Sequence, residues 1–127
     1  MNIVFDPIEE VLEQIRQGHL VIVTDDANRE NEGDLILAAE KATPALINFM
    51  IRYTSGVICV PMEGQDLDRL ELPLMTVRNT ESMRTAYTIS ADAKDGVTTG
   101  ISAADRSRTI RLLAEPSTKA QLHDTGR

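Results

Sequence analysis

Cysteine and aromatic residues are scarce in this 127-residue sequence, which has one cysteine, no tryptophan, two phenylalanines and two tyrosines. A single cysteine, Cys59, excludes an internal disulfide framework and is typical of proteins from a reducing compartment. We therefore expect a cytoplasmic location. Because hydrophobic residues still make up 42% of the chain, the core is expected to be mainly aliphatic.

Positive charge and long apolar runs are also scarce. Thirteen basic residues face twenty acidic ones, which gives a net charge of -7. Such a charge repels phosphate backbones and anionic lipid surfaces, so we expect neither a nucleic-acid nor a membrane partner. No apolar run approaches the length needed to cross a bilayer, and the segment Met1–Asp6 has no basic region leading into an apolar one. The sequence therefore supports neither insertion nor export.

The length suits one compact domain with a single core. Four segments have helical signals. The first has Asp6 as N-cap, Pro7 as first residue and Glu9 as capping-box partner, and ends at Gly18. The others are a helix opening at Thr43 and Pro44 with Leu46, Ile47, Met50 and Ile51 on its buried face, a short helix at Gln65–Leu70, and a helix from the Ser102 and Asp105 capping box to about Ala114.

Runs of β-branched and aliphatic residues predict strands between these helices. Two of them, Leu20–Thr24 and Leu35–Ala39, are continuous enough for buried strands and have no helix between them. The remaining predictions are strands at Val57–Val60 and Thr85–Ser90, a loop at Pro73–Met83 and a turn at Asp95-Gly96. The expected fold is α+β, with α/β layers in which helices flank one mixed, twisted sheet.

Five carboxylates crowd the connection between the first two predicted strands: Asp25, Asp26, Glu30, Glu32 and Asp34. If residues 30–34 are extended, the last three point to one side, because side chains alternate along a strand. Oxygen ligands suit Mg2+ or Mn2+ rather than zinc. A solvated acidic loop is the alternative. An EF-hand is excluded, because Asn31 and Leu37 stand where that loop needs glycine and glutamate.

A second motif, Gly96-Val97-Thr98-Thr99-Gly100, precedes the capped helix near Ser102. Its small residues would let backbone amides approach an anion at the helix start. Taken alone, it is better explained as a tight connection.

The two motifs occur in a fixed order, with Ser55-Gly56-Val57-Ile58-Cys59 between them. The string Arg29-Glu30-Asn31-Glu32-Gly33-Asp34 comes first, and Gly96-Val97-Thr98-Thr99-Gly100-Ile101-Ser102-Ala103-Ala104-Asp105-Arg106 comes last. This combination resembles the 3,4-dihydroxy-2-butanone 4-phosphate synthases of riboflavin biosynthesis, from Asp6 to about Thr118. The family acts on ribulose 5-phosphate, which it converts to the four-carbon phosphate and formate.

The resemblance implies a role for each matched residue. Glu30 would be the metal ligand for Mg2+ or Mn2+, and Glu30, Asp34 and Glu32 would be catalytic, with Asp34 or Glu32 moving protons. Substrate-binding residues would be Arg29, Glu30, Asp34, Thr98, Thr99 and Cys59. For Cys59, the alternative is a small buried hydrophobe. The family also implies a homodimer with active sites close to the subunit interface.

The sequence departs from the family after about Thr118. We expect a synthase-like domain over residues 1–118, incomplete at its C-terminal side, and a divergent tail over residues 119–127. The later family strings Arg-Pro-Gly-His and Arg-Gly-Gly-His-Thr, with the second metal ligand, and a late catalytic glutamate have no match here, and His123 is not mapped onto them. Three hypotheses remain: a synthase, an inactive remnant, and the N-terminal part of a bifunctional protein with GTP cyclohydrolase II. In each case we expect the 127-residue polypeptide alone to be inactive.

Overall fold

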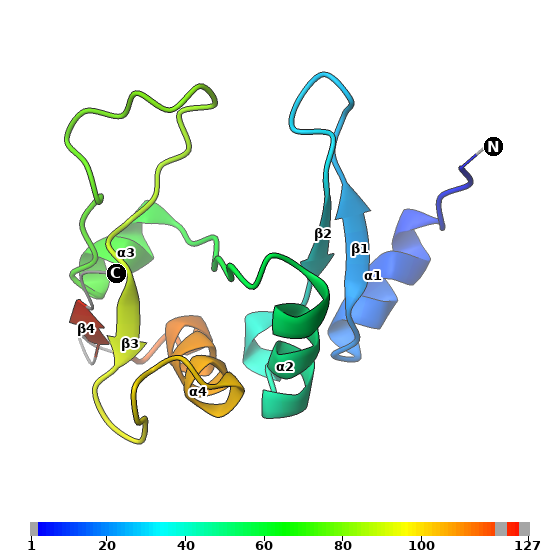
Figure 1. The fold of residues 1–127 in the computed structure, drawn as a ribbon. Coiled ribbons are helices and arrows are strands. Elements are labelled where there is room, and N and C mark those ends of the chain that lie inside the picture. Colours follow the sequence, from blue (N-terminus) through cyan, green and yellow to red (C-terminus); the bar gives the residue numbers. More distant parts are fainter. Residues whose placement is uncertain (1–2, 119–121, 125–127) are drawn as a thin grey trace.

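The structure is a computed structural model that describes residues 3–118 and 122–124 (Figure 1). The chain contains both helices and short strands. In order, the elements are α1 (Ile8–Arg16), β1 (Val21–Thr24), β2 (Gly33–Ile36), the 3-10 helix η1 (Ala39–Lys41), α2 (Pro44–Tyr53), α3 (Gly64–Arg69), β3 (Ala91–Ala93), α4 (Ala103–Ala114) and β4 (Leu122–Asp124).

The strands form two separate sheets, each of two antiparallel strands. In the first, β1 pairs with β2, with Val21 opposite Ile36 and Thr24 opposite Gly33. In the second, β3 pairs with β4, with Asp92 opposite His123. The combination of helix and sheet confirms the α+β class. The prediction of a single mixed sheet is wrong for the described residues, whose strands form antiparallel pairs only.

The core lies between α2 and α4, which lie side by side (Figure 1). Ala42, Ile47 and Ile110 are buried there, and partly buried apolar side chains from Leu37 after β2, from η1, α2 and α4, and from the segment after α2 pack around them. These contacts confirm Ile47 as the centre of the predicted buried face of α2. Among residues 3–118 and 122–124, no helix is long and apolar enough to cross a membrane.

Two of the three predicted helix caps are confirmed. The Thr43 hydroxyl accepts a hydrogen bond from the Leu46 amide at 3.3 Å, and the Ser102 hydroxyl accepts one from the Asp105 amide at 3.0 Å. The cap predicted at Asp6 is wrong. Pro7 occupies the N-cap of α1, with an extended backbone and no side-chain hydrogen bond. Proline already fixes φ, so the helix starts one residue later than its capping signal indicated.

The strand predictions are only partly right. β1 matches its prediction, whereas β2 begins two residues before Leu35 and ends at Ile36. Burial was predicted for both, but Ile22 in β1 is 71% exposed. Val57–Val60 forms no strand in the described structure, and Thr85–Ser90 makes only one bridge, between Leu74 and Thr88. An extended run becomes a ladder only where a second backbone lies beside it, and that depends on tertiary contacts.

Candidate functional site

The acidic connection between β1 and β2 is organised by its own carboxylates. Asp25 accepts hydrogen bonds from the backbone amides of Glu30 at 2.9 Å and Glu32 at 2.8 Å, and Asp26 accepts one from Asn28 at 2.8 Å. The amides of Glu32 and Glu30 hold the pKa of Asp25 below its ordinary value. Asp25 therefore stabilises the loop, which explains part of the acidic crowding without a ligand.

The prediction that residues 30–34 are extended is wrong. Residues 27–30 form a turn, Asn31 has φ of 53°, and β2 begins only at Gly33. The left-handed residue breaks the alternation of side chains. Glu30 and Asp34 line one cavity, whereas Glu32 is not among the described residues that line it. Arg29 is also outside this lining, with its Nε 3.9 Å from an oxygen of Asp25.

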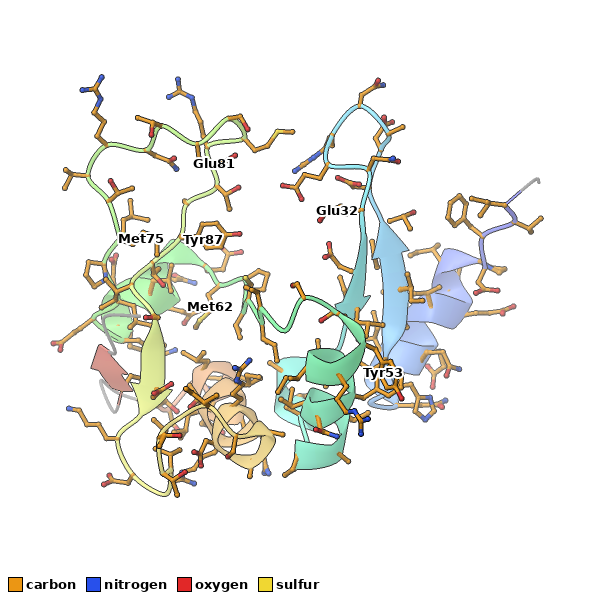
Figure 2. All side chains as sticks on the ribbon, viewed as in Figure 1. Glu32, Tyr53, Met62, Met75, Glu81 and Tyr87 are labelled. Carbon is orange, nitrogen blue, oxygen red and sulfur yellow. The ribbon has the colours of Figure 1, made fainter. Side chains whose placement is uncertain are left out.

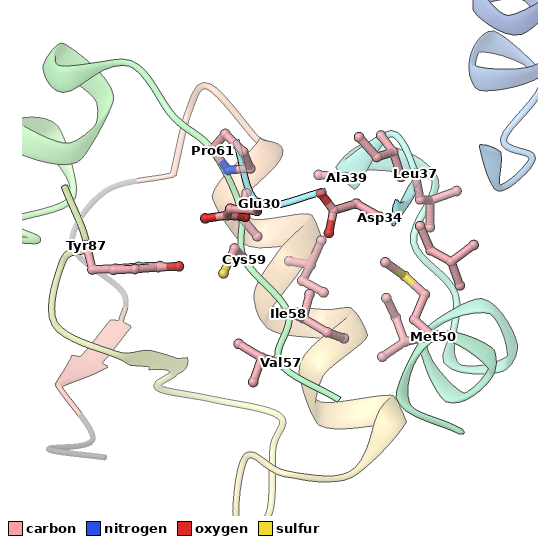
Figure 3. Close-up of a pocket in the computed structure, with 15 residues that line it drawn as sticks. Glu30, Asp34, Leu37, Ala39, Met50, Val57, Ile58, Cys59, Pro61 and Tyr87 are labelled. Atoms are coloured by element: carbon pink, nitrogen blue, oxygen red, sulfur yellow. The ribbon is translucent and has the colours of Figure 1, made fainter. Parts of the chain in front are cut away.

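The cavity that Glu30 and Asp34 share is open to solvent and has a volume of about 590 Å³. The other polar side chains lining it are Cys59, in the segment after α2, and Tyr87 (Figure 3). The rest of the lining is apolar and comes from β2, α2, α4 and the segment 57–61. The arrangement joins two carboxylates, a thiol and a phenol to an apolar wall, which is typical of a small-molecule site.

Cys59 lies at the wall of this cavity. It is exposed, so it is not the buried hydrophobe considered as the alternative. Tyr87 was missed, because Thr85–Ser90 had only a strand signal. No pattern in the sequence indicates that this segment returns to face Cys59 across the cavity (Figure 3). Its electrostatic interaction with Cys59 raises the pKa of Tyr87, and partial burial and the charge of Glu30 add to the rise.

The Gly96–Gly100 turn is tied to α4 by one buried carboxylate. Asp105, only 5% exposed, accepts hydrogen bonds from the Thr98 amide at 3.1 Å, the Thr98 hydroxyl at 2.7 Å and the Gly100 amide at 3.0 Å. These bonds, led by that from the Thr98 hydroxyl, lower the pKa of Asp105. The sequence predicted that backbone amides of this turn would approach an anion. At these donors, the Asp105 carboxylate takes the place of that anion.

The acidic motif and the Gly96–Gly100 motif lie apart in the structure. Thr98 and Thr99 are not among the described residues that line the Glu30 cavity. The connection between β3 and α4, which contains them, lies at the opposite end of the molecule from the connection between β1 and β2 (Figure 1). One copy of the chain therefore does not bring all the predicted substrate-binding residues together.

Glu30 and Asp34 provide part of a metal site. Their oxygen atoms are the ligands that Mg2+ and Mn2+ prefer, and the cavity is open to the waters that these ions retain. Across residues 3–118 and 122–124, no three histidine, cysteine, aspartate or glutamate side chains are placed to hold an ion together. The donor chemistry thus fits a hard divalent cation, but these described residues do not complete its coordination.

Comparison with known proteins identifies relatives of this chain. The family model for 3,4-dihydroxy-2-butanone 4-phosphate synthase matches residues 9–127. The riboflavin biosynthesis protein RibBA of Nocardia farcinica is 61% identical over 116 residues, which are 91% of this chain and 28% of that protein. RibBA of Rhodococcus jostii is 58% identical over 117 residues, or 92% of this chain and 28% of that protein.

Solved structures agree. A crystal structure of 3,4-dihydroxy-2-butanone 4-phosphate synthase in complex with two magnesium ions is similar with a TM-score of 0.93 and 43% identity, over 96% of this chain and 57% of that one. The synthase of Candida albicans has a TM-score of 0.85 and 47% identity, over 98% of this chain and 61% of that one. The chain therefore spans just over half of these solved proteins and under a third of the RibBA proteins.

Proposed function

Because this chain belongs to the 3,4-dihydroxy-2-butanone 4-phosphate synthase family, we propose that it forms the carboxylate part of an active site for ribulose 5-phosphate. The reaction yields 3,4-dihydroxy-2-butanone 4-phosphate and formate. The observation that carries the proposal is the meeting of Glu30 and Asp34, both from the acidic motif, in one open cavity with an apolar wall.

Each side chain in the cavity has a chemical task in this proposal. Mg2+ or Mn2+ bound at Glu30 would polarise the substrate ketone and stabilise the negative charge that develops on its oxygen. Asp34 is close enough to the same space to take a proton from carbon or hydroxyl and to return it. The apolar wall excludes part of the surrounding water, which strengthens these electrostatic interactions. Glu32 does not line the cavity, so its role in proton transfer rests on the family resemblance alone.

The metal assignment predicts weak binding that depends on Glu30. We expect Mg2+ to bind the chain weakly, and Glu30→Gln to weaken binding at least about tenfold, because a charged ligand becomes neutral. Isothermal titration calorimetry with Mg2+ measures this. Glu40→Gln is the matched control, since Glu40 lies in η1 and does not line the cavity. Equal Mg2+ affinity of the parent and Glu30→Gln would contradict the assignment.

The separation of the two motifs supports a homodimer. If Thr98 and Thr99 contact substrate, they do so from a second copy whose turn approaches the Glu30 cavity of the first. Exposed apolar side chains provide surface for such contact, including Ile22 at 71% and Val57 at 73% exposure. We expect sedimentation at micromolar concentration to show association rather than a monomer. A single, well-behaved monomeric species would contradict the dimer.

A further inference from the structure

Tyr87 is carried by a segment whose backbone is fixed on both sides. The Met75 amide donates to the Tyr87 carbonyl at 3.0 Å, and the Ile89 amide donates to the Pro73 carbonyl at 3.0 Å. These bonds hold the two arms of the segment 73–89 together around the bridge between Leu74 and Thr88. Figure 2 shows Tyr87 on the inner arm, closer to the body of the molecule than Glu81 at the far end. The direction of the Tyr87 side chain is thus set by its backbone.

The other end of the segment 73–89 is organised by Glu81. Its carboxylate accepts hydrogen bonds from the amides of Met83 at 2.9 Å and Thr85 at 3.1 Å, and the Asn79 side chain donates to the Thr85 carbonyl at 2.8 Å. The amides of Met83 and Thr85 lower the pKa of Glu81 to about 2. Since the segment has this internal bonding, the position of Tyr87 does not depend on a ligand.

The Tyr87 ring reaches across the cavity, with its hydroxyl directed toward Cys59 and Glu30 (Figure 3). The side chain is 49% exposed, so it contributes little to the core, which lies between α2 and α4. A ring placed for packing alone would not need to present its hydroxyl to a polar group in an open cavity. The position of Tyr87 is therefore better explained by the contents of the cavity than by stability.

Hydrogen-bonding capacity distinguishes Tyr87 from its neighbours. The polar side chains among the described residues lining the cavity are Glu30, Asp34, Cys59 and Tyr87. Carboxylates accept hydrogen bonds, and a thiol is a weak donor, so the phenol is the one strong side-chain donor in this set. Ribulose 5-phosphate has a ketone oxygen and phosphate oxygens that only accept. A cavity that binds this substrate beside two carboxylates needs a donor for those oxygens.

We infer that Tyr87 is a substrate-positioning residue whose hydroxyl donates a hydrogen bond to an oxygen of the sugar phosphate held beside Glu30 and Asp34. The inference rests on the proposed function, because it takes its substrate class from there. Sulfur is a weak acceptor, so a substrate oxygen displaces Cys59 as the partner of the phenol. Because the phenol is neutral, it supplies a donor without adding charge next to the carboxylates.

Tyr87→Phe tests this inference, since it removes the hydroxyl and keeps the ring. We expect the dissociation constant for ribulose 5-phosphate, measured by calorimetry in the presence of Mg2+, to rise roughly threefold to tenfold for the loss of one hydrogen bond. The affinity for Mg2+ alone and the thermal unfolding midpoint should not change, whereas a structural defect would move both. Tyr53→Phe is the matched control, because Tyr53 lies on α2, packs against Phe49 with the two rings tilted, and does not line the cavity.

Cys59 reports where the ligand binds. It is the only cysteine in the sequence, so protection from iodoacetamide by ribulose 5-phosphate locates the sugar phosphate in this cavity. If the parent binds and Tyr87→Phe binds equally well, the inference about Tyr87 is wrong and the proposed function stands. If the parent does not bind ribulose 5-phosphate at all, the proposed function itself fails and the Tyr87 inference fails with it.

Discussion

The 127-residue polypeptide by itself is expected to release no measurable formate from ribulose 5-phosphate in the presence of Mg2+. Among the described residues lining the Glu30 cavity there is no lysine, arginine or histidine, so none supplies positive charge to the substrate phosphate. No described cluster completes a metal site either. Groups that act as a unit fail together, and each missing acid-base group alone costs about 10²-fold to 10⁴-fold.

Extending the chain should reverse that result. The magnesium-bound synthase with a TM-score of 0.93 is matched over 57% of its length. A chimera that joins this chain to the remaining part of that synthase is expected to release formate. Glu30→Gln in the chimera should lower the rate by about 10²-fold to 10⁴-fold, and Glu40→Gln should leave it unchanged. Formate is measured by a coupled formate dehydrogenase assay.

Two outcomes would contradict this account. Turnover of the 127-residue polypeptide at the level of the chimera would show that the catalytic groups have been misplaced. A folded, soluble chimera that releases no formate would favour the inactive remnant, which keeps the cavity without the reaction. The two results are distinguishable, because in the first the polypeptide itself is active and the effect of Glu30→Gln on its formate release can be measured directly.

The second large effect is expected for Gly100→Ala. Gly100 has φ of +84°, and an added Cβ would overlap the carboxylate of Asp92 in β3. The left-handed backbone costs an L residue about 1–2 kcal/mol, and the steric overlap adds about 1–3 kcal/mol. We therefore expect the free energy of unfolding, measured by urea denaturation, to fall by about 2–5 kcal/mol. The amide of Gly100 also donates to Asp105, so the turn before α4 should loosen.

Gly64→Ala is the matched control for this change. Gly64 is the first residue of α3, and an added Cβ there would meet nothing within 4 Å. Because alanine is a better helix former than glycine, the free energy of unfolding of Gly64→Ala should be higher than that of the parent by about 0.5–1 kcal/mol. If Gly100→Ala and Gly64→Ala unfold at the same urea concentration, Asp92 is displaced easily and the turn is not strained.

Several features were predictable from sequence because their causes are local. The caps at Thr43 and Ser102 depend on a side chain and an amide three residues later, and both were found as predicted. The apolar period of α2 identified Ile47 as buried, since helical spacing alone decides which residues share a face. The acidic motif and the Gly96–Gly100 motif also indicated the family, which the comparisons confirm.

Other features depended on contacts between distant segments. Val57–Val60 has strand-forming residues but pairs with no strand in the part of the chain that the structure describes, and Tyr87 has no sequence signal that relates it to Cys59. The common direction of the side chains within residues 30–34 was predicted from strand alternation. A left-handed Asn31 and the hydrogen bonds to Asp25 changed the direction of Glu32 relative to Glu30. For Val57–Val60 and Tyr87 the deciding partner lies outside the window over which a propensity acts, whereas for residues 30–34 it is a nearby loop carboxylate that alternation does not take into account.

The sequence by itself therefore determined the helix starts at Thr43 and Ser102, the buried face of α2, the α+β class and the oxygen-rich chemistry around Glu30. These follow from spacing, capping and side-chain type, which need no knowledge of distant residues. Only the tertiary structure decided that Glu30 and Asp34 share a cavity with Cys59 and Tyr87, and that Thr98 lies elsewhere. That choice depends on how loops return to the core, because loop paths are fixed by packing between segments far apart in the chain.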